Sequence, residues 1–197
     1  MVNKNSNYNS FTEIIEAALA APGTIKMSTA GVGSMPWQGS AFITSVTGAQ
    51  FNQIPYDSDA STKTAVMSGE VDFGLCKIQS GIEEYKAGEL KFLCVLSTEP
   101  VPVMPEVPLV TAEYPDFAQY LPWGPFYGIW VKEGTDPAIS KILGDTFLAA
   151  AEQPEYQSVL ESFNINYIGT AGDEAQEYIR NWGENTTNAL KKSGIMD

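Results

Sequence analysis

The chain has 197 residues, of which 44% are hydrophobic and 18% are charged. This composition argues against wholesale disorder, and at ~150 residues per domain the length predicts one large domain or two small ones. The net charge of −13 disfavours nucleic acid and anionic membrane surfaces as partners, because a strongly acidic protein repels phosphate groups.

The first half of the chain alternates helices with strands. A capping box at Ser10–Glu13 starts the first helix, Pro36 suits the first turn of the second, and Ser58 caps the third. We expect helices over residues 10–21, 35–46, 58–67 and 81–87, and strands over residues 24–28, 49–56, 71–76 and 91–97. Alternation with such short connections favours a parallel sheet covered by helices.

The composition changes at residues 99–125, which contain seven prolines and favour an irregular crossing segment. Beyond this segment we expect strands over residues 126–132 and 165–168, and helices over residues 136–151, 154–163 and 172–193. The predicted organisation is therefore a lobe at residues 1–98, a crossing segment at 99–125 and a C-terminal part at 126–197.

A glycine-rich turn, Ser28–Ser34, joins the first predicted strand to the second helix. Two glycines allow a sharp turn, and the following helix directs its positive end toward it, which suits an anion or a carboxylate. A purely structural strand–helix turn explains the same residues. The turn is not a dinucleotide fingerprint, because Pro36 stands where the third glycine belongs, and no P-loop lysine follows.

Ligands of open α/β sheets bind beyond the carboxyl ends of the strands. The candidate residues there are Ser28, Thr29, Ala30, Gly31, Gly33, Ser34, Tyr56, Asp57, Ser58, Cys76, Lys77, Ser80, Phe126 and Tyr127. Lys77 is the one nearby cation, although it also fits a solvated surface lysine. Asp57 also fits a turn or a helix cap.

The sequence has no histidine, which excludes His-dependent nucleophiles and His-ligated zinc. Cys76 and Cys94 are too few for a zinc site, so we expect buried thiols, or a disulfide if their strands are neighbours. We expect no metal, no cofactor and no catalytic residue. No stretch approaches the ~20 apolar residues of a membrane span, and the polar N-terminus lacks the apolar region of an export signal.

Several landmarks occur in a familiar order. They are Ser10–Gly23, Ala30–Ser34, Ile54–Tyr56, Ser68–Phe73, Lys86–Leu90, Met104–Val110, Tyr127–Pro137 and Trp182–Ile195. With this set, the chain resembles the substrate-binding proteins of tripartite tricarboxylate transporters, the TctC or Bug family, from about Asn3 to the C-terminus. The resemblance implies a type II periplasmic-binding-protein-like α/β fold, with helices on both faces of a parallel or mixed sheet.

The resemblance also implies a periplasmic protein that captures a small organic carboxylate between two lobes and presents it to membrane permease subunits. Residues 1–98 then correspond to the second, ligand-binding lobe, and residues 126–197 to the C-terminal return of a first lobe that is mostly missing. The signal peptide would also be missing from this chain. An incomplete lobe would expose apolar surface, and that surface could join two copies into a homodimer.

The sequence departs from the family pattern at three places in the predicted site. Trp37 stands where the family usually has a histidine, Asp57-Ser58 where it often has Lys-Gly, and Cys76 where it has an acid. These changes favour a larger, more apolar or amine-bearing carboxylate over citrate. Two other functions fit the sequence: a ligand-sensing domain coupled to a receptor, and a small α/β enzyme that uses Asp57 or Asp72.

Overall fold

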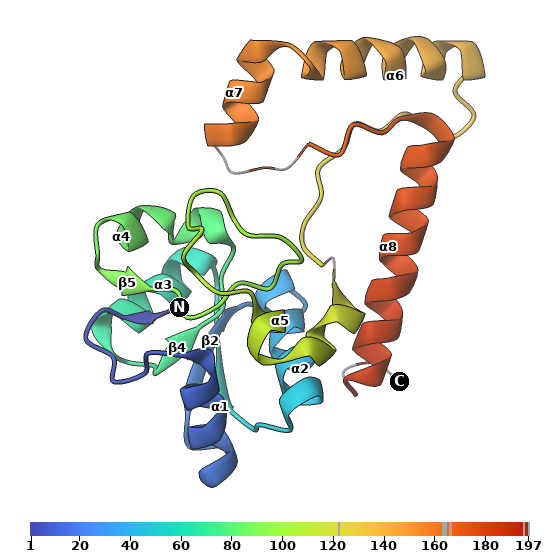
Figure 1. Ribbon diagram of the computed structural model, residues 1–197. Helices are drawn as coiled ribbons and strands as arrows, with labels where there is room; N and C mark the ends of the chain where they lie inside the picture. Colours follow the sequence, from blue (N-terminus) through green and yellow to red (C-terminus); the bar gives the residue numbers. More distant parts are fainter. Residues whose placement is uncertain (122, 163–164, 166, 195, 197) are drawn as a thin grey trace. The chain divides into compact units, whose positions relative to one another are not determined.

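The computed structural model describes residues 1–121, 123–162, 165, 167–194 and 196. The chain forms two compact units: Met1–Gly124 with Thr186–Asp197, and Pro125–Asn185 (Figure 1). The first unit contains β1 (Val2–Asn3), α1 (Phe11–Ala20), β2 (Lys26–Ala30), α2 (Met35–Thr47), β3 (Asn52–Tyr56), α3 (Asp59–Ser68), β4 (Phe73–Gly74), the 3-10 helix η1 (Ile78–Ser80), α4 (Ile82–Lys86), β5 (Leu90–Lys91), α5 (Val110–Glu113) and the 3-10 helix η2 (Pro115–Tyr120). The second contains α6 (Pro137–Ala151), α7 (Pro154–Ser162) and most of α8 (Gly172–Lys192).

The sheet that organises the first unit is parallel and has three strands in the order β3-β2-β4. Met27 in the central strand pairs with Gln53 of β3 and with Phe73 of β4. Strands β1 and β5 form a separate antiparallel pair, in which Val2 lies opposite Lys91. The order places the carboxyl ends of β2, β3 and β4 at one edge, where the predicted site residues of the first unit lie.

Helices cover both faces of this sheet, as predicted. Met27 points to the face covered by α1 and α2, where it joins a core that includes Ile14 and Ile43. Ser28, the next residue, points to the other face, because side chains alternate along a strand. On that face α3 packs closely, since a Cβ atom built on Gly74 would lie 2.6 Å from Ser28 Oγ and 2.8 Å from Val66 Cγ2.

The predicted helices are confirmed, and their caps explain where they begin. Ser10 Oγ accepts a hydrogen bond from Glu13 N, and Ser58 Oγ accepts one from Ser61 N. The Glu13 carboxylate accepts a hydrogen bond from Asn9 N. In a capping box it would accept from the N–H group of the N-cap residue, Ser10, which is one residue later. Gly48 and Gly69 end α2 and α3 in the left-handed conformation, which glycine adopts without steric cost.

The predicted strands over residues 71–76 and 91–97 are too long. Only Phe73–Gly74 and Leu90–Lys91 belong to strands, and Val95 makes an isolated parallel bridge with Leu109. Val95 N donates to Pro108 O, and Val110 N donates back to Val95 O. Pro108 has no N–H group, so the ladder ends there. The predicted irregular segment likewise contains two short helices, α5 and η2.

The second unit is helical among the residues that the structure describes. Helices α6 and α7 are joined at Glu152 and Gln153 (Figure 1). The predicted strand at residues 126–132 is wrong, because this stretch is neither strand nor helix. Residues 165, 167 and 168 of the last predicted strand are also not in a strand, and residue 166 lies outside the described residues. A strand needs a neighbour to complete its backbone hydrogen bonds, and the described part of this unit supplies none.

Candidate functional site

The turn after β2 leaves a set of backbone donors without partners. Ser34 closes the turn: its N–H donates to Gly31 O (3.0 Å), and its hydroxyl donates to Ala30 O and caps α2 by accepting from Trp37 N. Among the described residues, no partner accepts from the N–H groups of Val32 or Gly33, whereas the parallel register that pairs Ala30 with Tyr56 directs the Gly31 N–H group to Tyr56 O. These amides stand at the N-terminus of a 13-residue helix, where the peptide dipoles favour negative charge.

The tip of this turn is open to solvent. Val32 is 73% exposed, and Gly33 adopts φ +85°, which lets the backbone turn away from the sheet. Gly31 lies beside the end of β3, since a Cβ atom built on it would be 3.8 Å from Tyr56 O. Ser28 and Thr29, by contrast, are fully buried in β2, so their side chains contribute to packing and not to the exposed edge.

The residues after β3 lie beside the turn. Ser58 caps α3 and its hydroxyl lies 3.0 Å from Ser61 Oγ, while Asp57 is exposed. Burial, and then the nearby Glu70 carboxylate, raise the pKa of the Tyr56 hydroxyl above its usual value. Tyr56 therefore stays neutral at physiological pH and offers a polar group with an apolar ring.

The loop after β4 is held by a carboxylate that sequence reasoning missed. Asp59, the first residue of α3, is 8% exposed, and its Oδ2 accepts from Ser80 Oγ (3.1 Å) and pairs with Lys77 Nζ (3.4 Å). Lys77 is about half exposed, but its ion pair with Asp59 means that it is not a free surface cation. The only sequence signal for Asp59 is an acidic residue in the first helical turn, which is common and carries no functional meaning by itself.

The two cysteines are free thiols, and both are partly buried. Cys76 donates a weak hydrogen bond to Met1 Sδ (3.4 Å), and burial raises the pKa of its thiol to about 11. Burial raises the pKa of Cys94 to about 12. Cys76 thus lies at the end of β4 as a protonated, inward-facing group and does not replace an acid at the exposed edge.

These thiols predict a loss of stability in alkali. Their pKa values in the folded chain lie above the unfolded value of about 8.5, so the unfolded state loses protons first as the pH rises. The thiols contribute their full share to the free energy of unfolding below pH ~8.5, and this share is lost as the pH rises toward 11 to 12. We expect urea unfolding to give a falling free energy above pH ~9, with a shallower fall in the Cys94→Ala variant; an unchanged slope would contradict this.

The remaining predicted residues divide between the two units. Trp37 lies in the first turn of α2 and is partly buried. Phe126 and Tyr127 belong to the second unit, where the Phe126 ring packs edge-on against Trp182 (5.0 Å between centroids) and Tyr127 is 74% exposed. The structure therefore brings together the predicted residues of the first unit around the ends of β2, β3 and β4.

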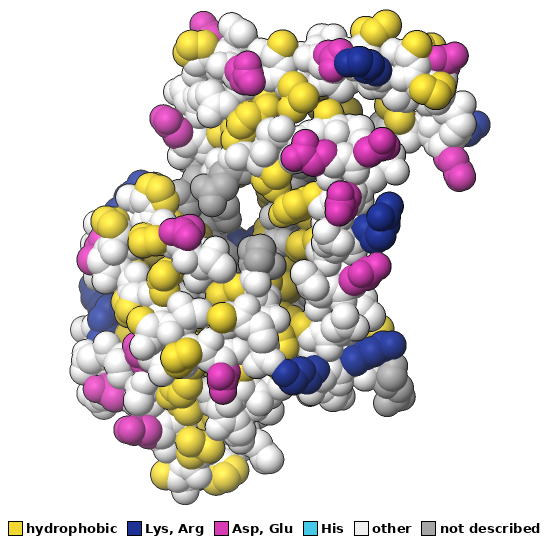
Figure 2. Space-filling view, turned by 45° about the vertical axis from the view of Figure 1, so that its right-hand side comes forward, with side chains coloured by type: hydrophobic (Ala, Val, Ile, Leu, Met, Phe, Trp, Pro, Cys, Tyr) yellow, Lys and Arg dark blue, Asp and Glu magenta, His cyan; other side chains and the backbone are white. Residues whose placement is uncertain are grey.

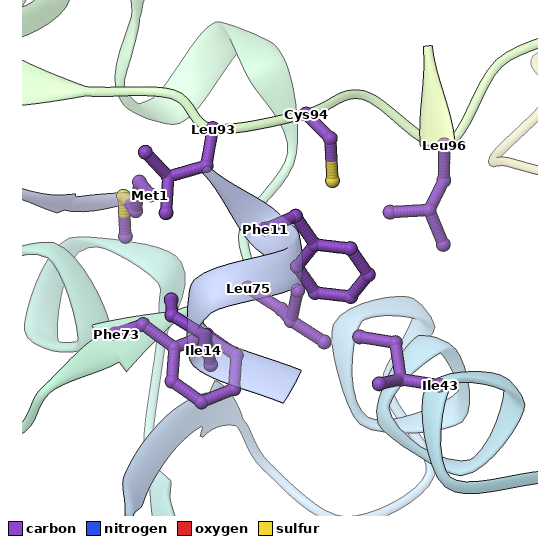
Figure 3. Close-up of a pocket in the computed structure, with 9 residues that line it drawn as sticks. All are labelled: Met1, Phe11, Ile14, Ile43, Phe73, Leu75, Leu93, Cys94 and Leu96. Atoms are coloured by element: carbon purple, nitrogen blue, oxygen red, sulfur yellow. The ribbon is translucent and has the colours of Figure 1, made fainter. Parts of the chain in front are cut away.

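A small cavity of about 30 Å³ lies on the α1 face of the sheet and is not this site (Figure 3). Its walls are Met1, Phe11, Ile14, Ile43, Phe73, Leu75, Leu93, Cys94 and Leu96. It is about the size of one water molecule and the side chains around it are hydrophobic, so it cannot hold a carboxylate. Among the described residues, no cluster of His, Cys, Asp or Glu is arranged to hold a metal ion, and no helix is long and apolar enough to cross a membrane.

Comparison with solved structures shows the fold. A protein of R. palustris solved with adipate superposes with a TM-score of 0.80 at 18% identity, covering 98% of this chain and 64% of that one. The periplasmic binding protein BugD gives a TM-score of 0.79 at 20% identity, with the same coverage. The predicted periplasmic-binding-protein-like fold is confirmed.

Comparison of sequences shows the family. A protein encoded in the tcbD–tcbE intergenic region of a Pseudomonas species is 24% identical over 173 residues, and the chain spans about half (50%) of its length. Residues 1–195 match the family described as the tripartite tricarboxylate transporter family receptor. Receptors of transporters bind solutes and are not enzymes, in agreement with the absence of a predicted catalytic residue. The chain belongs to the TctC family of tripartite tricarboxylate transporter receptors.

Proposed function

We propose that this chain captures a small organic carboxylate and, in its full-length form, delivers it in the periplasm to the permease subunits of a tripartite tricarboxylate-type transporter. The chain binds the solute and performs no chemistry on it. The ligand's carboxylate accepts hydrogen bonds from the backbone at Thr29–Ser34. The observation that carries the proposal is the pair of unpartnered amides of Val32 and Gly33, just before the start of α2.

Backbone donors suit this protein because its overall charge opposes anions. With a net charge of −13, the chain repels a carboxylate at long range, and Lys77 is already paired with Asp59. Amides fixed by the turn supply partial positive charge without a cation, and they lose no side-chain entropy when they bind. Since salt screens the long-range repulsion, we expect the affinity for adipate to be maintained or increased at higher ionic strength.

The test compares two substitutions of Gly31 by calorimetric titration with adipate and shorter dicarboxylates. Gly31→Ala adds a Cβ at an ordinary 3.8 Å from Tyr56 O and should keep the affinity. Gly31→Asp adds the same Cβ and a carboxylate beside the ligand's own, and should weaken binding at least ~10-fold. Equal effects of the two variants, or no heat with any carboxylate, would refute the proposal.

Cys76, Ser58 and the aromatic residues Trp37 and Tyr56 remain proposed contributors to specificity. Support for them comes from position, since Tyr56 and Ser58 follow β3 and Cys76 follows β4. Asp59 is added to the proposed site as a positioning residue, because its carboxylate holds Lys77 and Ser80 at the same edge of the sheet. We expect Asp59→Asn to release Lys77 and to change the affinity for a dicarboxylate more than Glu83→Gln, whose exposed carboxylate pairs with Lys86.

A further inference from the structure

One oxygen of the buried Asp59 carboxylate has no partner. Asp59 is 8% exposed, and its Oδ2 accepts from Ser80 Oγ and pairs with Lys77 Nζ. Its Oδ1 is also buried, but no residue that the structure describes donates a hydrogen bond to it. An ionised carboxylate has about four acceptor positions, and a buried oxygen without a donor costs free energy. Asp59 therefore has unused capacity for a hydrogen-bond donor.

The ion pair of Asp59 with Lys77 lies at the end of the strand that carries the glycine-rich turn. Asp59 follows β3 and Lys77 follows β4, each by three residues. The strand order β3-β2-β4 puts β2 between these two strands, at about 4.8 Å from each. Side chains from the two flanking strands that meet at 3.4 Å therefore meet across the carboxyl end of β2. The turn with the free amides of Val32 and Gly33 begins at that same end, so one small solute can reach both groups.

We propose that Asp59 binds an ammonium group of the solute, so that the preferred ligands are carboxylates that also carry an amine. This assignment rests on the proposed capture of a carboxylate by the turn, and it adds the class of solute. The carboxylate end accepts from the amides of Val32 and Gly33, and the ammonium end takes the place of Lys77 on Asp59. An ammonium group has three donors, enough for both carboxylate oxygens, whereas the ion pair with Lys77 is made at Oδ2.

Lys77 is the exchangeable half of the ion pair. Its side chain is 46% exposed, while that of Asp59 is 8% exposed. The distance of 3.4 Å between Lys77 Nζ and Asp59 Oδ2 exceeds the roughly 2.7–2.9 Å of a charge-assisted hydrogen bond. A displaced Lys77 is solvated by water, but the buried Asp59 carboxylate still needs a cation. The ammonium group of a solute meets that need.

The charges at this edge favour an amine over a second carboxylate. Asp57 and Asp59 carry two negative charges there and Lys77 one positive charge. Figure 2 shows acidic side chains spread over the visible face of the molecule, in line with the net charge of −13. A dicarboxylate that drew Lys77 away would leave Asp59 buried and unpaired, which is costly. An aminocarboxylate brings its own cation, and its zero net charge avoids the long-range repulsion.

Calorimetric titration of the 197-residue chain with matched solutes tests this assignment. The solutes 6-aminohexanoate, adipate and hexanoate share a six-carbon chain and differ at the second end, which is an ammonium, a carboxylate or a methyl group. The solutes 4-aminobutanoate, succinate and butanoate repeat the comparison with four carbons. We expect the amine of the better-fitting length to bind at least ~10-fold more tightly than both of its counterparts.

Three variants separate recognition of the ammonium group from effects on folding. Asp59→Asn should weaken binding of the amine at least ~10-fold and strengthen binding of the dicarboxylate, because Lys77 is released. Lys77→Met removes the competing cation and should have the opposite effect on each solute. Glu83→Gln, which neutralises an exposed carboxylate paired with Lys86, is the control and should change neither affinity. Partial unfolding lowers both affinities together, so it cannot imitate this reversal.

Two results bear on the assignment and on carboxylate capture separately. A wild-type chain that binds the amines no better than the matched monocarboxylates would overturn the role of Asp59. If Gly31→Asp then still weakened the binding of hexanoate, capture of a carboxylate by the turn would stand without it. No binding of any of these solutes would overturn both.

Discussion

Replacing Gly74 by alanine is expected to lower the free energy of unfolding by about 3 kcal/mol. The new Cβ atom would stand 2.6 Å from Ser28 Oγ, 2.8 Å from Val66 Cγ2 and 3.1 Å from Thr62 Cγ2. All three neighbours are buried, between the central strand and α3, so none of them can move into solvent. The strand and the helix must separate, and the carboxyl ends of the strands move with them.

Urea unfolding followed by circular dichroism measures this effect, and Gly124→Ala is the matched control. A Cβ atom on Gly124 meets nothing within 4 Å, so this variant should stay within ~0.5 kcal/mol of the wild type. If close packing is the cause, Val66→Ala should cost less in the Gly74→Ala background than in the wild type, because it removes one of the clashing methyl groups. Additive costs would rule that cause out.

Replacing Phe42 by alanine should destabilise the first unit by roughly 3–5 kcal/mol. Its ring is 1% exposed, stacks on Tyr120 with 4.8 Å between centroids, and meets the edge of Trp123 at 5.2 Å. These contacts anchor α2, whose N-terminus carries the proposed binding turn. The cavity would form in the largest core cluster, where the surrounding helices and sheet limit its collapse.

Leu19→Ala provides the comparison for Phe42→Ala, because Leu19 is 50% exposed and also lies in a helix. Thermal unfolding should show only a small change for Leu19→Ala and a large one for Phe42→Ala. A cost below ~1 kcal/mol for Phe42→Ala would mean that η2, which supplies Tyr120, does not hold α2 in place.

The helices of this fold are predictable from sequence because their end signals are local. Ser10, Ser34 and Ser58 each cap a helix through a hydrogen bond to an amide three residues later, and Gly48 and Gly69 end two of them. Such signals need no knowledge of the rest of the chain. The glycine-rich turn is predictable for the same reason, since the sequence places it between a strand and a capped helix.

The strands are less predictable because they depend on a partner. Residues 126–132 have strand-forming side chains, but no neighbouring strand within the described part of the chain. Residues 91–97 have a partner in the segment that contains Pro108, and that proline ends the pairing. The hydrophobic pattern of a segment does not show whether a neighbouring strand exists, nor whether that neighbour has a backbone N–H group at each position of the ladder.

Asp59 could not be assigned from sequence because its role depends on a distant loop. It lies eighteen positions before Lys77, and the parallel pairing of β2 with both β3 and β4 brings the two together. In sequence it is one acid among 24 acidic residues, and its position after Ser58 suggests only a favourable charge at a helix start. Its burial is the information that the sequence lacks.

The most direct test of carboxylate capture is a titration of the ¹⁵N-labelled chain with adipate, followed by amide NMR shifts. The account predicts saturable shifts at Val32 and Gly33, where the amides lack partners, and at the neighbouring Gly31 and Ser34. It also predicts little change at Gly48, whose backbone has a positive φ like that of Gly33 but whose N–H group already donates to Thr44 O. Shifts that avoid the turn, or that follow only the exposed lysines, would contradict the proposed site.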